Sequence, residues 1–169
     1  MNSEDDRNVV LTGFMATGKT TVGQALALLL DRAFVDADAE IVRRAGMSIP
    51  QIFERDGEPR FRALEHEVCM DLNSERGLVI ATGGGMLVDP ENRRRMLDTG
   101  LVVCLDAQKD VIGARLAAAQ ERPLAGDWAA LFDKRRAAYA AIPVHIDTGG
   151  KTPETIAQEI LTLWQNDSP

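Results

Sequence analysis

The sequence predicts an α/β fold with a mainly parallel β-sheet. Short apolar runs that suit buried strands alternate along the chain with stretches whose apolar residues recur at helical spacing. The chain has 169 residues, which suits one compact domain or two small lobes that share one core. Hydrophobic residues make up 45% and charged residues 27%, a balance typical of globular proteins and too apolar for a disordered chain.

The first two predicted strands flank a predicted helix. Residues 9–11 and 33–35 are the short apolar runs that we assign to strands. Between them, apolar residues recur on one face of a helix: Val22, Ala25, Leu26, Leu29 and Leu30. This order of strand, helix and strand is the signature of a parallel sheet.

Two further helices are predicted before the third strand. Ser48 and Gln51 form a capping box for a helix that ends near Gly57. Pro59 can occupy the first position of the next helix. The apolar face of that helix consists of Phe61, Leu64, Val68 and Leu72.

The second half of the chain continues the alternation. The remaining strands are predicted at residues 78–81, 101–105 and 144–146. Asp89 and Pro90 cap a helix that ends around Gly100. The last helix opens at Pro153, and its apolar face consists of Ile156, Ile160, Leu163 and Trp164. Since ligands of such sheets bind beyond the carboxyl ends of the strands, the residues directly after each strand are the candidates for a site.

The charge balance excludes some partners. The chain carries 19 Lys and Arg residues against 26 Asp and Glu residues, a net charge of −7. Nucleic acid and anionic membranes reward a basic surface, so neither is expected to be the main partner. Residues 1–6 are polar and acidic, unlike a signal peptide, and no apolar run approaches the roughly twenty residues that span a bilayer.

The two cysteines do not form a disulfide framework. Cys104 lies inside an apolar run, where a thiol behaves as a small hydrophobe, and we expect both it and Cys69 to be buried and reduced, as in the cytosol. His66 lies three residues before Cys69, but no further ligands accompany the pair, so a metal site there is not expected.

The segment between the first strand and the first helix matches a phosphate-binding loop. Residues 13–20 fit the pattern G-x-x-x-x-G-K-[ST] in full. The glycines let backbone N–H groups converge on phosphate oxygens, and the helix adds its N-terminal dipole. Lys19 can bridge the β- and γ-phosphates, and the Thr20 hydroxyl can bind Mg²⁺. The loop predicts a nucleoside triphosphate site without separating kinase, GTPase and ATPase.

Two carboxylates follow the second strand. Alternate residues of an extended chain point the same way, so Asp36 and Asp38 can both face the phosphate loop. One could hold Mg²⁺, while the other accepts a hydrogen bond from an acceptor hydroxyl. The alternative is that one of them only caps the helix that begins near Ala39.

Basic residues and glycines elsewhere allow more than one interpretation. Arg62 and Glu65 share a helix face and can pair, either within a site or on the surface. Arg122 lies in a loop that could be a mobile lid or an ordinary connector. Residues 134–136 are a basic run whose default interpretation is a solvated face. The three glycines 83–85 permit close approach of the backbone to a ligand.

Taken together, these motifs resemble those of the shikimate kinase family over nearly the whole chain. The resemblance rests on the phosphate loop, on residues 34–38, 52–65 and 82–85, on Arg122-Pro123-Leu124, and on Arg135 with Tyr139. It implies ATP-dependent phosphorylation of the 3-hydroxyl of shikimate, a step of aromatic amino-acid (chorismate) biosynthesis, with Mg²⁺ as cofactor. It also implies a P-loop fold of the nucleoside monophosphate kinase type, with sheet order 2-3-1-4-5. The chain would be a single kinase domain over residues 1–169, monomeric and cytoplasmic, with a substrate-binding region around residues 37–65 and a lid around 116–127.

The resemblance also implies residue roles. Thr20 and Asp36 would organise Mg²⁺, and Asp38 would orient the shikimate hydroxyl or take its proton. The shikimate carboxylate would be held by Arg62, which Glu65 keeps in place, and by Arg135, and the shikimate would also contact the backbone of Gly84 and Gly85. ATP would be bound by Ala16, Thr17, Gly18, Lys19, Thr20, Thr21, Arg115, Arg122 and Lys151, with Lys19 and Arg122 acting on the phosphates.

The sequence departs from the family pattern at Ala16 and in the helix after the lid, where residues 135–139 read RRAAY and the family commonly has proline and leucine. The segment from Tyr139 to the fifth strand is also about one residue short. Ala16 stands where glycine is usual, so this turn is expected to avoid a positive φ or to adjust slightly. Arg135 fits the spacing to Tyr139 best as the carboxylate ligand, with Arg136 as the alternative. The competing functions are another small-molecule kinase, such as a gluconate kinase, and a nucleotide-binding protein without activity. A degenerate protein would be expected to lose some of Lys19, Asp38, Arg62 and Arg122, and all four are present.

Overall fold

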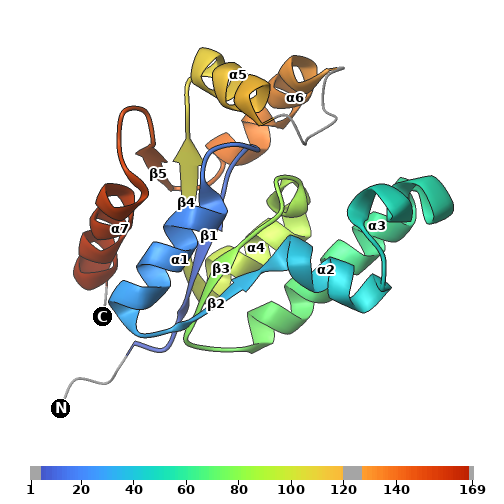
Figure 1. Cartoon of the computed structure of the whole chain (residues 1–169). Helices are drawn as coiled ribbons and strands as arrows, with labels where there is room; N and C mark the ends of the chain where they lie inside the picture. The colour runs from blue at the N-terminus through green and yellow to red at the C-terminus, as the bar shows by residue number, and fades with distance from the viewer. Residues whose placement is uncertain (1–4, 120–126, 168–169) are drawn as a thin grey trace.

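The computed structural model describes residues 5–119 and 127–167, and it contains one five-stranded parallel sheet. The strands are β1 (Asn8–Thr12), β2 (Ala33–Asp36), β3 (Leu78–Ala81), β4 (Gly100–Asp106) and β5 (Val144–Asp147). Their spatial order is β2-β3-β1-β4-β5, which confirms the expected order (Figure 1). In the central register, Val10 pairs with Ile80 of β3 on one side and with Val102 of β4 on the other.

Helices cover both faces of this sheet (Figure 1). They are α1 (Lys19–Leu30), α2 (Ala37–Ala45), α3 (Ile49–Ser74), α4 (Pro90–Thr99), α5 (Lys109–Ala118), α6 (Trp128–Ala140) and α7 (Pro153–Asp167), with a short 3₁₀ helix, η1 (Met86–Val88). Side chains alternate along each strand, so Val9 and Leu11 pack toward α1 and α7, whereas Val10 packs toward α3 and α4. Two apolar layers therefore hold the sheet from both sides.

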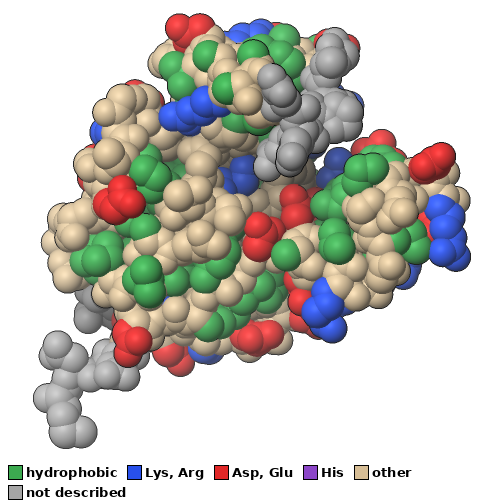
Figure 2. All heavy atoms as spheres, viewed as in Figure 1, with side chains coloured by type: hydrophobic (Ala, Val, Ile, Leu, Met, Phe, Trp, Pro, Cys, Tyr) green, Lys and Arg blue, Asp and Glu red, His purple; other side chains and the backbone are tan. Residues whose placement is uncertain are grey.

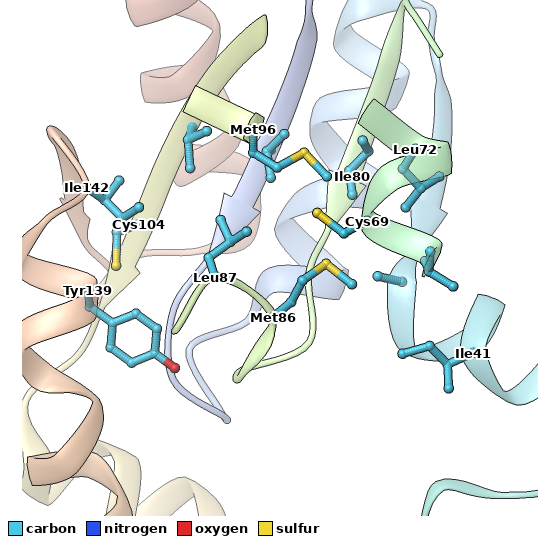
Figure 3. Packing of buried hydrophobic residues seen from close by; sticks show 14 of the residues in the cluster. Ile41, Cys69, Leu72, Ile80, Met86, Leu87, Met96, Cys104, Tyr139 and Ile142 are labelled. Atoms are coloured by element: carbon cyan, nitrogen blue, oxygen red, sulfur yellow. The ribbon is translucent and has the colours of Figure 1, made fainter. Parts of the chain in front are cut away.

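The layer beneath α3 and α4 contains both cysteines. Figure 3 shows Cys69, Met86 and Met96 packed around the strand residue Ile80. Cys69 and Cys104 are buried and free, as the sequence predicts. Burial raises the pKa of the Cys69 thiol to about 12 and raises the pKa of Cys104 as well. Both thiols therefore stay protonated at neutral pH and act as packing groups.

The predicted helix break inside α3 is confirmed. Ser48 and Gln51 form the capping box, with each side chain bonded to the backbone of the other residue. Gly57 interrupts the helix with φ 81° and ψ 170°, a backbone conformation in which glycine is favoured. The chain then turns, and Pro59 lies in the first turn of the second half, whose predicted apolar face is buried.

Two apolar predictions are wrong in detail. Leu163 of α7 is 37% exposed and Leu29 of α1 is 47% exposed, although both were assigned to buried faces. Each lies at the edge of a narrow buried stripe, which in α7 consists of Ile156, Ala157, Ile160 and Trp164. In the described part of the chain, no helix is both long and apolar enough to cross a membrane.

Candidate active site

The phosphate loop connects β1 to α1 at the carboxyl edge of the sheet. Gly13 and Gly18 have φ values of 137° and 91°, so both glycines of the motif adopt conformations that other residues rarely take. The Lys19 ammonium group donates to the carbonyls of Gly13 at 2.7 Å and Phe14 at 2.8 Å. The loop is thus wrapped around its own lysine, which must release these carbonyls to reach a phosphate.

Ala16 does not avoid a positive φ. Its φ is 60°, in the left-handed region, so of the two expected outcomes for this turn, avoiding a positive φ or adjusting slightly, the first is wrong. Such a conformation costs a non-glycine residue roughly 1–2 kcal/mol. Arg115 donates to the Ala16 carbonyl at 2.8 Å, and its Nη1 also lies 3.4 Å from the Thr148 hydroxyl. Arg115 therefore holds the strained turn from α5.

A cavity of about 490 Å³ opens beside the loop. Figure 2 shows the hollow, with acidic and basic side chains on its walls. It is lined by Met15, Ala16, Gly18, Lys19, Thr20, Thr21, Asp36, Asp38, Ala39, Val42, Thr82, Gly84, Leu116 and Ala119. Five of the six residues 16–21 that were predicted to bind ATP line it. The Thr17 side chain instead is buried and donates to the Phe14 carbonyl at 2.8 Å, which leaves only its backbone for a ligand.

The two carboxylates do not reach this cavity by strand alternation, and the helix cap that the sequence offered as the alternative is present. Only Asp36 belongs to β2, and Asp38 lies in the first turn of α2, so strand alternation is not what aligns them. Asp36 Oδ1 accepts the backbone N–H groups of Asp38 at 2.9 Å and Ala39 at 3.2 Å, so it caps α2. Both carboxylates nevertheless line the cavity.

Asp36 also faces the phosphate loop. Its other oxygen, Oδ2, accepts the Thr20 hydroxyl at 3.1 Å. A carboxylate and a hydroxyl oxygen side by side, at the entrance of a phosphate loop, are the hard oxygen donors that Mg²⁺ prefers. These two residues therefore fit the predicted magnesium site.

A second cavity, of about 340 Å³, adjoins the first across the three glycines. Gly84 lines the first cavity, whereas Gly85 lines the second. The lining residues of the second cavity are Glu58, Arg62, Glu65, Gly85, Val88, Asp89, Asn92, Leu131, Lys134 and Arg135. Two guanidinium groups thus face a space next to the phosphate cavity, which suits an anionic acceptor.

Arg62 is positioned by an ion pair with a buried carboxylate. Arg62 Nη1 lies 2.8 Å from Glu65 Oε1, and the Glu65 side chain is only 2% exposed. Burial raises the pKa of Glu65, and the hydrogen bond from Arg62 opposes this increase. The negative charge of Asp38 also raises the pKa of Glu65.

The two candidate arginines of α6 line different cavities. Arg135 lies against Gly84 and Gly85 and lines the same cavity as Arg62. Arg136 faces another cavity, of about 570 Å³, that also borders Asp106. Arg135 is therefore the partner of Arg62, and the basic run 134–136 is not simply a solvated face.

Of the other predicted ATP-binding residues, Lys151 is not brought into the phosphate cavity. The Lys151 ammonium group lies 3.0 Å from a Glu159 carboxylate oxygen and does not line the cavity. Arg122, predicted as the lid arginine, lies outside the described residues, as does most of the predicted lid. The residues just before that segment contribute Leu116 and Ala119 to the cavity wall.

Sequence reasoning missed a cluster of metal-ligand types at the other end of the site. Among the described residues, the ligand atoms of Cys104, Asp106 and His145 all lie within 4.8 Å of one another. His145 Nδ1 lies 2.7 Å from Asp106 Oδ2, and its Nε2 lies 2.8 Å from the Ile142 carbonyl. Both ring nitrogens are thus already engaged, so this cluster is a hydrogen-bonded network between β4 and β5, separate from Thr20 and Asp36.

The fold and the site define a P-loop kinase of the nucleoside monophosphate kinase type. The family model for shikimate kinase matches residues 15–165. A shikimate kinase of Geobacter sulfurreducens is 51% identical over 165 residues, which cover 94% of this chain and 91% of the relative. A shikimate kinase of Persephonella marina is 41% identical over 92% of this chain and 97% of its own length. The chain belongs to the shikimate kinase family.

Solved structures agree with this assignment. A shikimate kinase from Acinetobacter baumannii in complex with shikimate has a TM-score of 0.89 and 37% identity, and the match covers 97% of this chain and 96% of that one. The enzyme from Aquifex aeolicus has a TM-score of 0.81 and 36% identity over 95% and 97% of the two chains. A gluconokinase from Sinorhizobium meliloti, at 17% identity and a TM-score of 0.65, shares only the fold.

Proposed function

We propose that this chain transfers the γ-phosphoryl group of ATP to the 3-hydroxyl of shikimate. The observation that carries the proposal is the pair of adjoining cavities, one built by the phosphate loop and one by two arginines. Asp38 lines the phosphate cavity, and its carboxylate lies against Gly83, next to the glycines that border the two cavities, so it stands where donor and acceptor would meet. The gluconate-kinase alternative has only a distant likeness of fold in its favour.

The arginine cavity would hold the acceptor by its carboxylate. Arg62 and Arg135 present planar guanidinium groups, which bind carboxylates through paired hydrogen bonds. Glu65 would keep Arg62 in the binding orientation through the 2.8 Å ion pair. The backbone of Gly84 and Gly85 would complete the contact, because these glycines separate the two cavities.

The transfer step would depend mainly on positioning and charge neutralisation. Lys19 would move from the carbonyls of Gly13 and Phe14 onto the β- and γ-phosphates. Mg²⁺, held by Thr20 and Asp36, would supply charge neutralisation at those phosphates. Asp38 would accept the hydrogen bond of the acceptor hydroxyl and direct its oxygen at the γ-phosphorus. Arg122 would add a third positive charge at these phosphates.

The finer organisation is part of the proposal. A single domain, residues 1–169, would act as a monomer, with the acceptor bound around residues 37–65 and a lid around 116–127. Arg115 would lie on the adenine side, since it already holds the Ala16 carbonyl at the edge of the phosphate cavity. Free, buried cysteines suit the reducing cytoplasm, and the net charge of −7 makes nucleic acid an improbable partner.

The direct test is ADP release from MgATP with a panel of acceptors: shikimate, quinate, gluconate and nucleoside monophosphates. We expect shikimate to stimulate ADP release far above the rate without acceptor. A variant with Lys19→Met is the control that separates this chain's activity from a contaminating kinase. Stimulation by gluconate or a nucleotide instead of shikimate would contradict the proposal.

A further inference from the structure

The three glycines after β3 are not required by backbone shape. None of Gly83, Gly84 and Gly85 has a φ in the left-handed region. Their carbonyls are also engaged: Gly83 accepts the Met86 N–H at 3.2 Å, Gly85 accepts the Val88 N–H at 3.1 Å, and Gly84 accepts the Tyr139 hydroxyl. The segment is a fixed turn, so neither flexibility nor a positive φ explains three glycines in succession.

What the three glycines share is a charged side chain lying against the α-carbon. A Cβ atom at Gly83 would lie 3.2 Å from Asp38 Cγ and closer still to its Oδ1. At Gly85 a Cβ would lie 2.5 Å from Arg62 Nη1. At Gly84 it would lie 2.9 Å from Arg135 Nη1. A Cβ at Gly85 would also lie 3.2 Å from Arg135 Nη2. Contacts this short would force a displacement, so the three glycines leave the space that these charged groups occupy.

We propose that residues 83–85 are positioning residues, whose missing side chains leave the space that charged groups need: Gly83 for Asp38, Gly84 for Arg135 and Gly85 for Arg62. The inference rests on the proposed function for the roles of those three groups. Gly83 is the clearest case, because it does not itself line the phosphate cavity, although its neighbours Thr82 and Gly84 do. A change at Gly83 therefore reaches the reaction through Asp38.

A methyl group at Gly83 would displace the Asp38 carboxylate and leave the backbone in place. The atoms that it meets belong to the end of a side chain, which can rotate away, and alanine tolerates the backbone conformation there. The carboxylate would shift by about 1 Å, and a misplacement of that size can cost about 10²-fold in rate. The phosphate loop is untouched, so ATP binding should persist.

The experiment compares steady-state kinetics of Gly83→Ala and Gly85→Ala in the full chain. We expect Gly83→Ala to lower kcat by about 10²-fold while KM for ATP stays within about 2-fold. Gly85→Ala should instead raise KM for shikimate by about 10-fold or more, because it displaces a binding group. If both variants lowered kcat, raised KM and lowered the thermal stability to the same extent, the glycines would have a merely structural role and the proposal would be overturned.

A double-mutant cycle tests whether Gly83 acts through Asp38. In an Asp38→Ala background the carboxylate is gone, so adding Gly83→Ala should change kcat by less than about 2-fold. If Gly83→Ala lowered kcat by about 10²-fold in the Asp38→Ala background as well, the proposal would be contradicted. If the parent chain shows no shikimate-dependent ADP release, the proposed function fails. The positioning role of Gly83 is then tested by crystal structures of the parent chain and of Gly83→Ala. An Asp38 carboxylate in the same place in both structures would overturn the proposal.

Discussion

Arg62 Nη1 lies 2.8 Å from Glu65 Oε1, and these two residues differ sharply in exposure. The Arg62 side chain is 38% exposed and faces the acceptor cavity, whereas the Glu65 side chain is 2% exposed beneath it. Arg62 therefore has its Nη1 on a buried anion, whereas its Nε and Nη2 lie 3.4 Å from the exposed carboxylate of Glu58 at the acceptor cavity. Breaking such a pair leaves the remaining charge poorly compensated, so both positions are sensitive to substitution.

The Glu65→Gln substitution should impair acceptor binding. Glutamine keeps the volume but removes the charge that orients Arg62, so we expect KM for shikimate to rise about 10-fold, equivalent to about 1.4 kcal/mol. The matched control is Glu58→Gln, since Glu58 is 63% exposed and lies 3.4 Å from the same arginine. An exposed pair contributes little, so this control should change KM by less than about 2-fold. Equal effects of the two variants would contradict the role of Glu65.

The two arginines of α6 should behave differently. Arg135→Ala removes a guanidinium group from the acceptor cavity, so we expect KM for shikimate to rise about 10- to 100-fold. Arg136→Ala removes the same charge from a different cavity and should leave KM within about 2-fold. Steady-state kinetics at saturating ATP measure both. A larger effect of Arg136→Ala would show that the assignment of the carboxylate ligand is wrong.

Asp36→Asn separates the two tasks of this residue. Asparagine is as good a helix N-cap as aspartate, so the free energy of unfolding should change by less than about 0.5 kcal/mol. The loss of a charged oxygen beside Thr20 should raise the Mg²⁺ concentration that half-saturates activity by about 10-fold. Denaturant unfolding and a Mg²⁺ titration of activity measure the two effects. An unchanged Mg²⁺ requirement would exclude Asp36 from the metal site.

Tyr139 is the one tyrosine of the chain, which makes its ionisation directly observable. Burial raises its pKa to about 12, and nearby Arg135 opposes this increase. The pKa of Tyr139 is higher in the folded state than in the unfolded state. The contribution of this side chain to the free energy of unfolding is therefore fully present below about pH 10 and is lost as the pH rises through about 12. Absorbance of tyrosinate should therefore appear near pH 12 in the native protein and near pH 10 in urea. Ionisation near pH 10 in both would contradict the burial of this hydroxyl.

The strands were predictable because buried parallel strands are continuous apolar runs. Residues 78–81 were assigned to a strand from their apolar character alone, and β3 has these bounds. The α3 break was predictable because Ser48, Gln51, Gly57 and Pro59 are local signals with a known geometry. Where the signal lies in neighbouring residues, sequence reasoning was sufficient.

The details that local patterns left open or predicted wrongly depend on contacts between distant segments. Whether Arg135 or Arg136 faces the site depends on the rotation of α6 about its axis, which no local pattern specifies. Ala16 takes a positive φ in a turn held by Arg115, which is 99 residues away in the chain. Gly83 was interpreted as allowing a ligand to approach, whereas in the structure the approaching group is the side chain of Asp38.

The central claim is that phosphate moves from ATP to shikimate at the junction of the two cavities. The most direct measurement is phosphorus NMR of a reaction that contains the chain, MgATP and shikimate. The account predicts ADP and a new shikimate phosphomonoester in equal amounts, with little inorganic phosphate. ATP converted only to ADP and inorganic phosphate, or left unchanged, would contradict it.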